Sequence, residues 1–246
     1  MIGLLGAGNM ARALARGWGE PVLATDGGSG RAAELVRELG GEVLTTPEIA
    51  ARADVLVLSH KPHQLREVAA EAAPNARCAV VSVLGGTTLE DLRAAYPGAN
   101  AVVRAMPNTP VEVRGGVIVI AAESDDVDFA RDLFARVGRV FVLPEAKLSA
   151  ATATMGVVPA YLALVLEAHV DAAVKHGLPA DLASDLTIAS MAGTAKLATA
   201  RGGDTLAMRR EVTSPGGSTA RGLAALEEGG VRAAFEAAMR AVVDPR

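Results

Sequence analysis

The chain has 246 residues, half of them hydrophobic and only 3% aromatic, and its formal net charge is −4. This length suits one large or two small domains. The sequence has no basic stripe of the kind that indicates nucleic-acid binding. The single cysteine, Cys78, excludes an intrachain disulfide and fits a reducing compartment. No signal peptide is visible, and no uninterrupted apolar run reaches the ~18–20 residues that span a bilayer. We therefore expect a cytoplasmic protein with neither a nucleic-acid nor a membrane partner.

Strands and helices alternate through the first part of the chain. Predicted strands cover residues 2–5, 22–25, 43–44, 54–59, 79–84, 101–104, 117–121 and 139–142. Predicted helices cover residues 10–18, 31–39, 47–52, 65–72, 89–95 and 126–136. Short apolar strands separated by helices are typical of a doubly wound parallel sheet that is buried on both faces. The sequence thus predicts an α/β fold, with this sheet in a domain over residues 1–145.

The pattern becomes purely helical after Pro144. Predicted helices cover residues 146–174, 182–200, 206–210, 220–228 and 231–243. Pro159 should kink or break the first of these helices, and Asp181 should cap the second. The helices are apolar on more than one face, which a lone domain of this size cannot easily bury. We predict an all-helical domain over residues 146–246 that forms an intertwined dimer; the alternative is a compact monomer.

A glycine-rich segment follows the first predicted strand directly and opens a helix. Its sequence, Gly6-Ala7-Gly8-Asn9-Met10-Ala11, matches G-x-G-x-x-G/A. In this pattern Gly6 makes the tight turn, Gly8 lets a pyrophosphate approach, and Ala11 allows helix and strand to pack. The position after the first strand of a βαβ unit predicts dinucleotide binding by residues 6–10, as in a Rossmann-type domain.

The end of the second predicted strand bears on the choice of cofactor. Asp26 stands about 20 residues after Gly6, where a carboxylate can bond the ribose 2′-OH and would repel a 2′-phosphate, which favours NADH. Ser29 and Arg31 follow and could instead hold the phosphate of NADPH. The sequence leaves NADH and NADPH open.

Two further segments follow predicted strands, and ligands bind at the carboxyl ends of strands in such sheets. Lys61 and Pro62 come after strand 54–59, and we expect them to line the cofactor site. Met106, Pro107 and Asn108 begin a rigid loop after strand 101–104, and its backbone and Asn108 could hold the nicotinamide. His60 and His63 are interpreted as scaffold or surface residues, and no cluster with metal-ligand spacing is visible, so we expect no metal.

The segment 212–219, Val-Thr-Ser-Pro-Gly-Gly-Ser-Thr, sets hydroxyl residues around a Pro-Gly-Gly turn directly before a predicted helix. Glycines let the backbone come close to a ligand, and the free N–H groups of a helix N-terminus favour an anion. We expect the N–H groups of Gly216, Gly217 and Ser218, with help from Ser214, to bind a substrate carboxylate. The alternative is that the hydroxyls only cap the helix. An anion site and a cofactor site together suggest a two-substrate redox enzyme.

Together, these motifs resemble those of the pyrroline-5-carboxylate reductase family over nearly the whole chain. The matching segments are Gly6 to Ala11, Lys61-Pro62, Met106 to Pro110, Pro159 to Tyr161 with Gly177-Leu178, and Val212 to Thr219. The last segment is highly specific. Two departures stand out: Ser218 replaces a threonine, and Val157 and Val158 stand where the family has serine and glycine. These valines bear on the size of the substrate pocket.

The resemblance implies hydride transfer from NADPH or NADH to the C5 imine carbon of Δ1-pyrroline-5-carboxylate, a cyclic imino acid. The product is L-proline, and this is the last step of proline biosynthesis. Thr219 is expected to bond the ring nitrogen as the catalytic residue. The family fold implies a Rossmann domain and a helical dimerisation domain, often assembled as a decamer, with the active site between one subunit's Rossmann domain and its partner's helices.

Two other interpretations stay open. The first is another imine reductase or a β-hydroxyacid dehydrogenase on the same scaffold. A hydroxyacid dehydrogenase needs a lysine in the helical domain, for which Lys175 and Lys196 are candidates by type only. The second is a dinucleotide-binding regulator that binds the cofactor without turnover.

Overall fold

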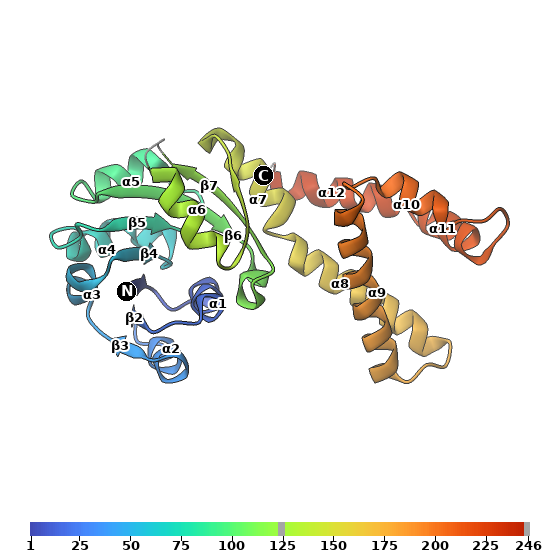
Figure 1. The fold of residues 1–246 in the computed structure, drawn as a ribbon, viewed down its shortest axis with the longest axis horizontal. Coiled ribbons are helices and arrows are strands. Elements are labelled where there is room, and N and C mark those ends of the chain that lie inside the picture. The colour runs from blue at the N-terminus through green and yellow to red at the C-terminus, as the bar shows by residue number, and fades with distance from the viewer. Residues whose placement is uncertain (123–125, 244–246) are drawn as a thin grey trace. The chain divides into compact units, whose positions relative to one another are not determined.

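The computed structural model describes residues 1–122 and 126–243, which are drawn as a ribbon in Figure 1. The chain forms two compact units, Met1–Pro159 and Ala160–Arg246. The first unit is a sheet covered by helices, and the described part of the second contains helices alone. The predicted α/β class is thereby confirmed. The predicted domain boundary at residue 145 stays a prediction.

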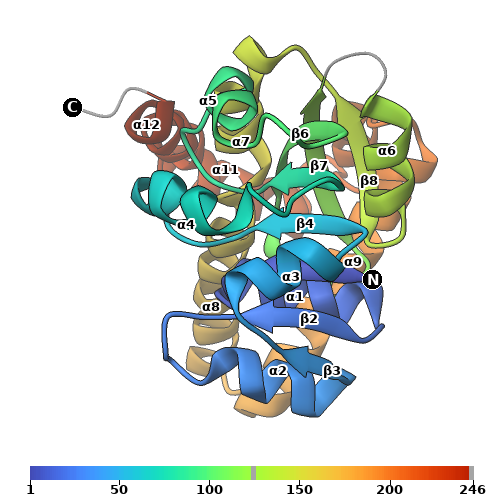
Figure 2. The same cartoon turned by 90° about the vertical axis from the view of Figure 1, so that its left-hand side faces the viewer.

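An eight-stranded sheet forms the centre of the first unit, in the order β3-β2-β1-β4-β5-β6-β7-β8 (Figure 2). The six strands from β3 to β6 reproduce the doubly wound order of dinucleotide-binding sheets. The bounds are β1 (Ile2–Leu5), β2 (Val22–Thr25), β3 (Gly41–Val43), β4 (Val55–Leu58), β5 (Ala79–Ser82), β6 (Ala101–Pro107), β7 (Gly116–Ala122) and β8 (Gly138–Val142). Each predicted strand is therefore present, with ends that differ by a few residues.

One pair of strands departs from the predicted parallel sheet. β6 and β7 are antiparallel, with Val103 opposite Ala122, whereas every other neighbouring pair is parallel. The connection between them holds only the short 3₁₀ turn η2 (Thr109–Val113). A parallel return needs a crossover of about a dozen residues or more, so this short link forces the chain to reverse.

Helices cover both faces of the sheet because successive residues of each strand point to opposite sides. Leu4 and Val57 pack on one face against α1, α2 and α6, whereas Leu5 and Leu58 pack on the other against α3, α4 and α5 (Figure 1). The helices are α1 (Asn9–Trp18), α2 (Arg31–Leu39), α3 (Thr46–Arg52), α4 (Leu65–Ala72), α5 (Leu89–Ala95) and α6 (Val127–Ala135).

A further helix, α7 (Leu148–Met155), belongs to the first unit although it follows the last strand. Its residues Leu148 and Met155 are buried against Val119 and Ala121 of β7. This apolar contact explains why the compact unit extends beyond the end of β8.

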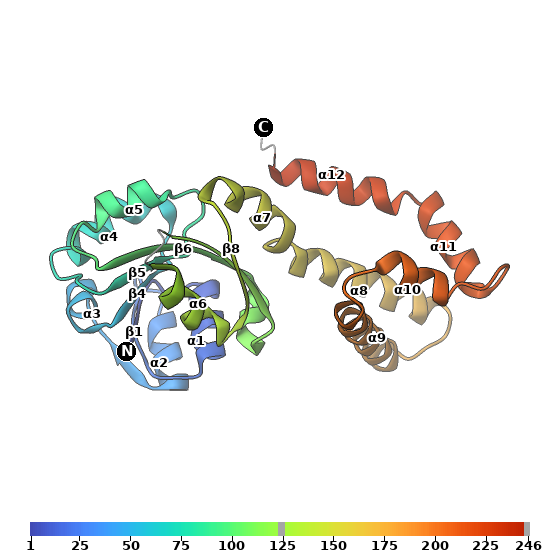
Figure 3. The same ribbon diagram turned by 45° about the horizontal axis from the view of Figure 1, so that its top comes forward.

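The second unit consists of α8 (Val158–Lys175), α9 (Ala180–Ala200), α10 (Thr205–Glu211), α11 (Ser218–Glu228) and α12 (Val231–Val243), seen in Figure 3. The predicted break at Pro159 is confirmed, because α7 ends at Met155 and the proline lies in the first turn of α8, where its missing N–H is harmless. The capping prediction for Asp181 is wrong. α9 begins earlier, after Pro179, and Asp181 lies inside its first turn.

The second unit buries little of its own surface. Among its described residues only Ala183 and Thr187 are buried. Helical residues 145–175, which begin in the first unit and run into the second, are also long and apolar enough to cross a membrane by length and composition, and 17% of the apolar 18-residue window is buried. The stretch contains the helix break at Gly156 and the charged side chains of Glu167 and Asp171. The exposed apolar side chains of the second unit are therefore available for contact with a partner.

Candidate functional site

The turn between β1 and α1 is shaped by Gly6. Its φ of 106° lies in the left-handed region, and its N–H donates to the carbonyl of Thr25 at 3.1 Å. A Cβ on Gly6 would lie 2.8 Å from the backbone nitrogen of His60. The hydroxyl of Ser59 donates to the Gly6 carbonyl at 2.7 Å and ties the turn to the end of β4. Conformation and space both require glycine at this position.

The N-terminus of α1 follows this turn. Gly8 is its N-cap residue, and no side chain caps the helix there. A Cβ on Gly8 would meet nothing closer than the Ser59 carbonyl at 3.8 Å, so the protein leaves room beside Gly8 for a ligand. The first intrahelical bond is donated by Arg12 to Gly8, at 3.1 Å. The N–H groups of residues 9–11 therefore have no acceptor within the helix, which suits the pyrophosphate of a dinucleotide.

Asp26 follows β2 and organises the loop in front of α2. Its carboxylate accepts from the Gly28 N–H at 2.8 Å, the Ser29 hydroxyl at 3.0 Å and the Ala32 N–H at 2.8 Å. The hydrogen bond from Ala32 is the main cause that holds the pKa of Asp26 below its ordinary value of 3.8. Arg31, the first residue of α2, is exposed. Asp26 thus lies where the sequence predicted, with its oxygens engaged by its own loop.

A cavity of about 360 Å³ opens beside the Gly6 turn. Thr25 and Asp26 line it from the end of β2, and His60 lines it from the end of β4. Glu67 and Glu71 of α4 complete its polar lining on another side. The cavity lies at the carboxyl ends of β1 and β4, where the strand order reverses, and this is where such sheets bind their ligands.

Lys61 and Pro62 follow β4 at the same edge of the sheet. The Lys61 N–H donates to Oε1 of Gln64 at 3.0 Å, and Pro62 opens the 3₁₀ turn η1 (Pro62–Gln64). The Lys61 side chain is exposed, and its ammonium has no ion-pair partner within residues 1–122 and 126–243. It can therefore serve a ligand without first breaking a salt bridge.

The loop after β6 carries the predicted Met106, Pro107 and Asn108. β6 extends through Pro107, so only Asn108 lies beyond the strand. Asn108 is buried; its Nδ2 donates to the Met155 carbonyl at 3.1 Å, and its Oδ1 accepts from the Val117 N–H at 2.8 Å. The side-chain amide is thus used to hold this loop. Its backbone is engaged too, since the Asn108 N–H donates to the Val117 carbonyl and the Asn108 carbonyl accepts from the Val111 N–H, each at 3.2 Å. A contact to a nicotinamide would use the second lone pair of that carbonyl.

The segment 212–219 in the second unit forms a tight turn. The Gly217 N–H donates to the Ser214 carbonyl at 3.1 Å, and Gly216 has a φ of 70°. Proline and then a left-handed glycine at the two central positions are typical of a type II turn. A Cβ on Gly217 would lie 2.4 Å from the Ser214 Oγ, so only glycine leaves that hydroxyl in place. Arg221 donates to the Gly216 carbonyl at 2.7 Å and braces the turn.

The donors that this turn presents differ from the predicted set. The Gly217 N–H is already used within the turn, so Gly217 contributes its conformation rather than a donor. α11 begins at Ser218, and the first intrahelical N–H belongs to Arg221, which donates to Gly217 at 3.2 Å. The N–H groups of Ser218 and Thr219 are therefore without an intrahelical acceptor. Thr219, which the sequence did not count as a backbone donor, joins the set because it follows the N-cap by two residues.

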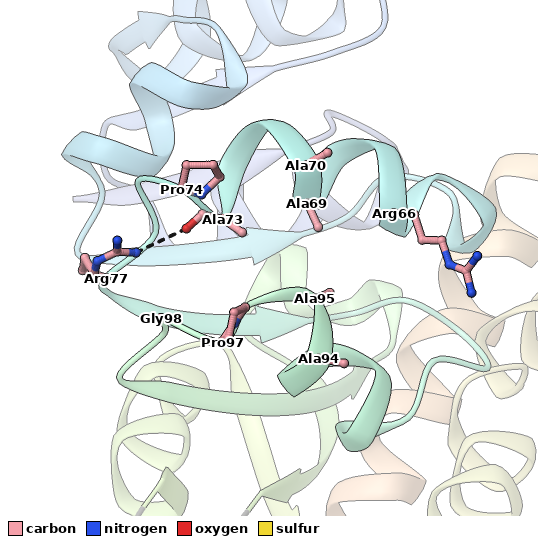
Figure 4. A pocket seen from close by; sticks show the side chains of 10 residues that line it. All are labelled: Arg66, Ala69, Ala70, Ala73, Pro74, Arg77, Ala94, Ala95, Pro97 and Gly98. Carbon is pink, nitrogen blue, oxygen red and sulfur yellow. Dashed lines mark hydrogen bonds between the residues drawn. The ribbon is translucent and has the colours of Figure 1, made fainter.

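A second cavity, of about 670 Å³, lies between α4 and α5 (Figure 4). Alanine and proline side chains make up most of its walls, with Arg66 and Arg77 among the lining residues. Arg77 is turned to the backbone and donates to the Ala73 carbonyl at 3.3 Å. This groove has no phosphate-binding turn and no converging set of polar groups. Its size alone does not make it the functional site.

Potential metal ligands are not grouped in the structure. Across residues 1–122 and 126–243 no three His, Cys, Asp or Glu side chains lie close enough to hold an ion. The single cysteine, Cys78, is half-buried, and burial raises the pKa of its thiol. The two candidate ligand sites are therefore the Gly6 turn in the first unit and segment 212–219 in the second.

Comparison with known proteins assigns both parts of the chain. Residues 145–245 match the family model for pyrroline-5-carboxylate reductase dimerisation, and residues 1–86 match that for NADP oxidoreductase, coenzyme F420-dependent. The chain is 40% identical over 199 residues to the pyrroline-5-carboxylate reductase of Synechocystis sp., which covers 79% of this chain and 74% of that relative.

Solved structures agree over the full length. The pyrroline-5-carboxylate reductase of Coxiella burnetii has a TM-score of 0.84 and 31% identity, covering 99% of this chain and 96% of that chain. The pyrroline carboxylate reductase of Plasmodium falciparum with NADP bound has a TM-score of 0.86 and 26% identity, covering 99% and 95%. The sequence motifs, the fold and these matches lead to one conclusion: the chain belongs to the pyrroline-5-carboxylate reductase family.

Proposed function

We propose that this chain reduces Δ1-pyrroline-5-carboxylate to L-proline with NADPH or NADH. The observation that carries the proposal is the turn at Ser214–Gly217, which presents unpaired N–H groups and hydroxyls at the start of α11. A small carboxylate is the ligand that such a turn accepts. The cyclic imino acid has one carboxylate and one reducible C=N bond, so hydride goes to C5 and a proton goes to the ring nitrogen.

The residues around the first turn fit a dinucleotide. Any residue other than glycine would be strained at position 6, and Gly8 leaves open space for a ligand beside the backbone. No side chain caps the start of α1. When bound, the reduced nicotinamide supplies the hydride. Residues 6–10 hold the pyrophosphate, Lys61 and Pro62 border it, and Met106 and Pro107 with the backbone of Asn108 border the nicotinamide.

The carboxylate of the substrate binds at segment 212–219. The N–H groups of Gly216, Ser218 and Thr219 donate to it, and the Ser214 hydroxyl adds a further donor. The Thr219 hydroxyl bonds the ring nitrogen, fixes its orientation and passes it a proton. A protonated imine is already electrophilic, so orientation supplies much of the rate. Gly217 is needed for the turn and for the position of Ser214.

The helical unit also supports self-association. The match to a dimerisation family over residues 145–245 and the exposed apolar side chains of α8 and α9 both indicate a homo-oligomer. We place the protein in the cytoplasm as a homodimer formed through this unit, with a decamer as the larger assembly. Light scattering on the purified protein measures the size of the assembly directly.

The test of the reaction is oxidation of NADH and NADPH by the purified protein with Δ1-pyrroline-5-carboxylate, with proline identified as the product. Thr219→Ala should lower kcat/KM at least about tenfold, because it removes the bond to the ring nitrogen. Thr205→Ala is a matched control, since Thr205 is also exposed and opens the helix α10. A loss below about threefold for Thr219→Ala, or ~0.7 kcal/mol, would remove Thr219 from the mechanism.

The same assay separates the other interpretations. Oxidation of β-hydroxyacids without reduction of the cyclic imine would favour a hydroxyacid dehydrogenase. Binding of both cofactors without turnover of either would favour a regulator. Either result would direct attention to Val157 and Val158, which are half-buried at the start of α8.

A further inference from the structure

The cavity beside the Gly6 turn is acidic. Its lining includes three carboxylates, Asp26, Glu67 and Glu71, and no lysine or arginine. Its remaining members are neutral side chains or glycines, namely Leu5, Gly6, Thr25, Gly27, Thr45, Thr46, His60, Gln64 and Val68. A ligand in this cavity therefore meets negative charge that no lining cation offsets.

Two of the carboxylates come from one face of α4. Glu67 and Glu71 are four residues apart, so their side chains lie one above the other on successive turns of the helix. At this separation their like charges repel. Neither forms an ion pair in the part of the chain that the structure describes. Their charges are thus available to a ligand rather than neutralised by a neighbour.

His60 adds no positive charge to the cavity. Its Nδ1 lies 2.9 Å from the Lys61 carbonyl, which can only accept, so the proton is on Nδ1. Burial is the main cause that lowers the pKa of His60 below 6.5. The buried Nε2 has no partner in the described structure and carries a lone pair. His60 is therefore a neutral residue in an acidic wall.

Two arginines near the starts of α1 and α2, Arg12 and Arg31, lie outside the cavity lining. Arg12 of α1 donates to Oδ1 of Asn9 at 3.2 Å and lies 3.8 Å from a carboxylate oxygen of Glu34. Arg31 is exposed at the start of α2 and is absent from the cavity wall. A phosphate in this cavity would therefore meet no lysine or arginine in the cavity wall itself.

We propose that this cavity receives the adenosine end of the cofactor and that its carboxylates, above all Glu67 and Glu71, select NADH against NADPH. This inference rests on the proposed function. Ribose hydroxyls donate hydrogen bonds, which carboxylates accept. A phosphate monoester brings a charge of about −1.5 to −2 and acceptor oxygens only. The α4 pair extends the selection beyond Asp26, whose oxygens already hold the loop before α2.

The experiment measures dissociation constants of NADH and NADPH on the purified full-length protein by calorimetry, separately from turnover. The wild type should bind NADH at least about tenfold more tightly at low ionic strength, and the ratio should shrink as salt screens the exposed glutamates. The double variant Glu67→Gln/Glu71→Gln should tighten NADPH binding about fivefold and leave NADH binding within about twofold. The control Glu90→Gln/Asp132→Asn removes the same charge from exposed positions outside the cavity and should change neither constant.

Equal or tighter binding of NADPH by the wild type would overturn the proposal, and selective loss of that binding in Arg31→Ala would assign the phosphate to Arg31. A double variant whose two dissociation constants match those of its control would also overturn the proposal. If NADPH is preferred and both cofactors still drive proline formation, the proposed function stands and only the cofactor inference falls. If neither cofactor binds, both fail together.

Discussion

The two units of this chain obtain their stability in different ways. In the first, α1 buries Leu14 completely, and the indole N–H of the buried Trp18 donates to the Leu133 carbonyl at 3.1 Å. In the second, α9 is longer than α1, yet only Ala183 and Thr187 are buried and Leu186 is 52% exposed. Apolar composition alone therefore does not tell where the core lies.

The comparison has a thermodynamic meaning. Apolar area stabilises a fold only when it is removed from water, by about 25 cal/mol for each Å². The first unit removes that area within one chain, so its stability should not depend on protein concentration. In the proposed dimer the second unit removes it against a partner copy, so its stability should rise with concentration by mass action.

The largest expected effect is on the second unit. Leu186→Lys places a charge on the exposed apolar face of α9, in the wall of a cavity shared with α8. A buried unpaired charge costs about 4 kcal/mol, so self-association should weaken about a thousandfold. Val43→Lys is the control, because Val43 is 50% exposed at the edge strand β3 of the first unit. Light scattering that shows both variants assembled like the wild type would contradict the comparison.

The next effect tests the first unit. Leu14→Ala removes a fully buried side chain from α1 and should lower the free energy of unfolding by about 3 kcal/mol. Denaturation at two protein concentrations should give the same loss for the transition of this unit. Val113→Ala, at a residue that is 79% exposed, should change it by less than about 0.5 kcal/mol. A loss that varies with concentration would mean that the first unit also depends on a partner.

A smaller effect is expected at the loop after β6. Asn108→Ala leaves the Val117 N–H and the Met155 carbonyl without their partners. Unsatisfied buried groups should cost about 2 kcal/mol in chemical denaturation. Asn75→Ala, at an exposed residue after α4, is the control. No difference between the two variants would show that Asn108 is free for another task.

The smallest effect concerns pH. Hydrogen bonds from Ala32 and its loop lower the pKa of Asp26 in the folded state, so the folded protein holds that proton less tightly than the unfolded chain. The stabilisation is present above the ordinary pKa of 3.8 and is lost as the pH falls through the lowered value. Because Asp26 is partly exposed, solvent screening keeps this contribution to the free energy of unfolding below about 1 kcal/mol. Unfolding curves of Asp26→Asn and wild type should therefore converge in acid, and a constant gap would contradict this.

Much of the candidate site was visible in the sequence because it depends on backbone conformation. Gly6 and Gly216 adopt positive φ angles that their neighbours' turn patterns already demanded. The roles of Asn108 and Gly217 could not be read in the same way. Their polar groups are consumed by partners that come from tertiary contact with Met155 and Val117, or from the closure of the turn onto Ser214.

By itself the sequence determined the local elements, since strand and helix periodicity, glycine turns and proline breaks act over a few residues. It also determined the family through motifs in a fixed order. Only the tertiary structure decided that β7 runs antiparallel, that α7 packs with the first unit, and that Glu67 and Glu71 face the cavity beside Gly6. These features depend on which distant segments meet, and that choice is made by burial over the whole unit rather than by any local pattern.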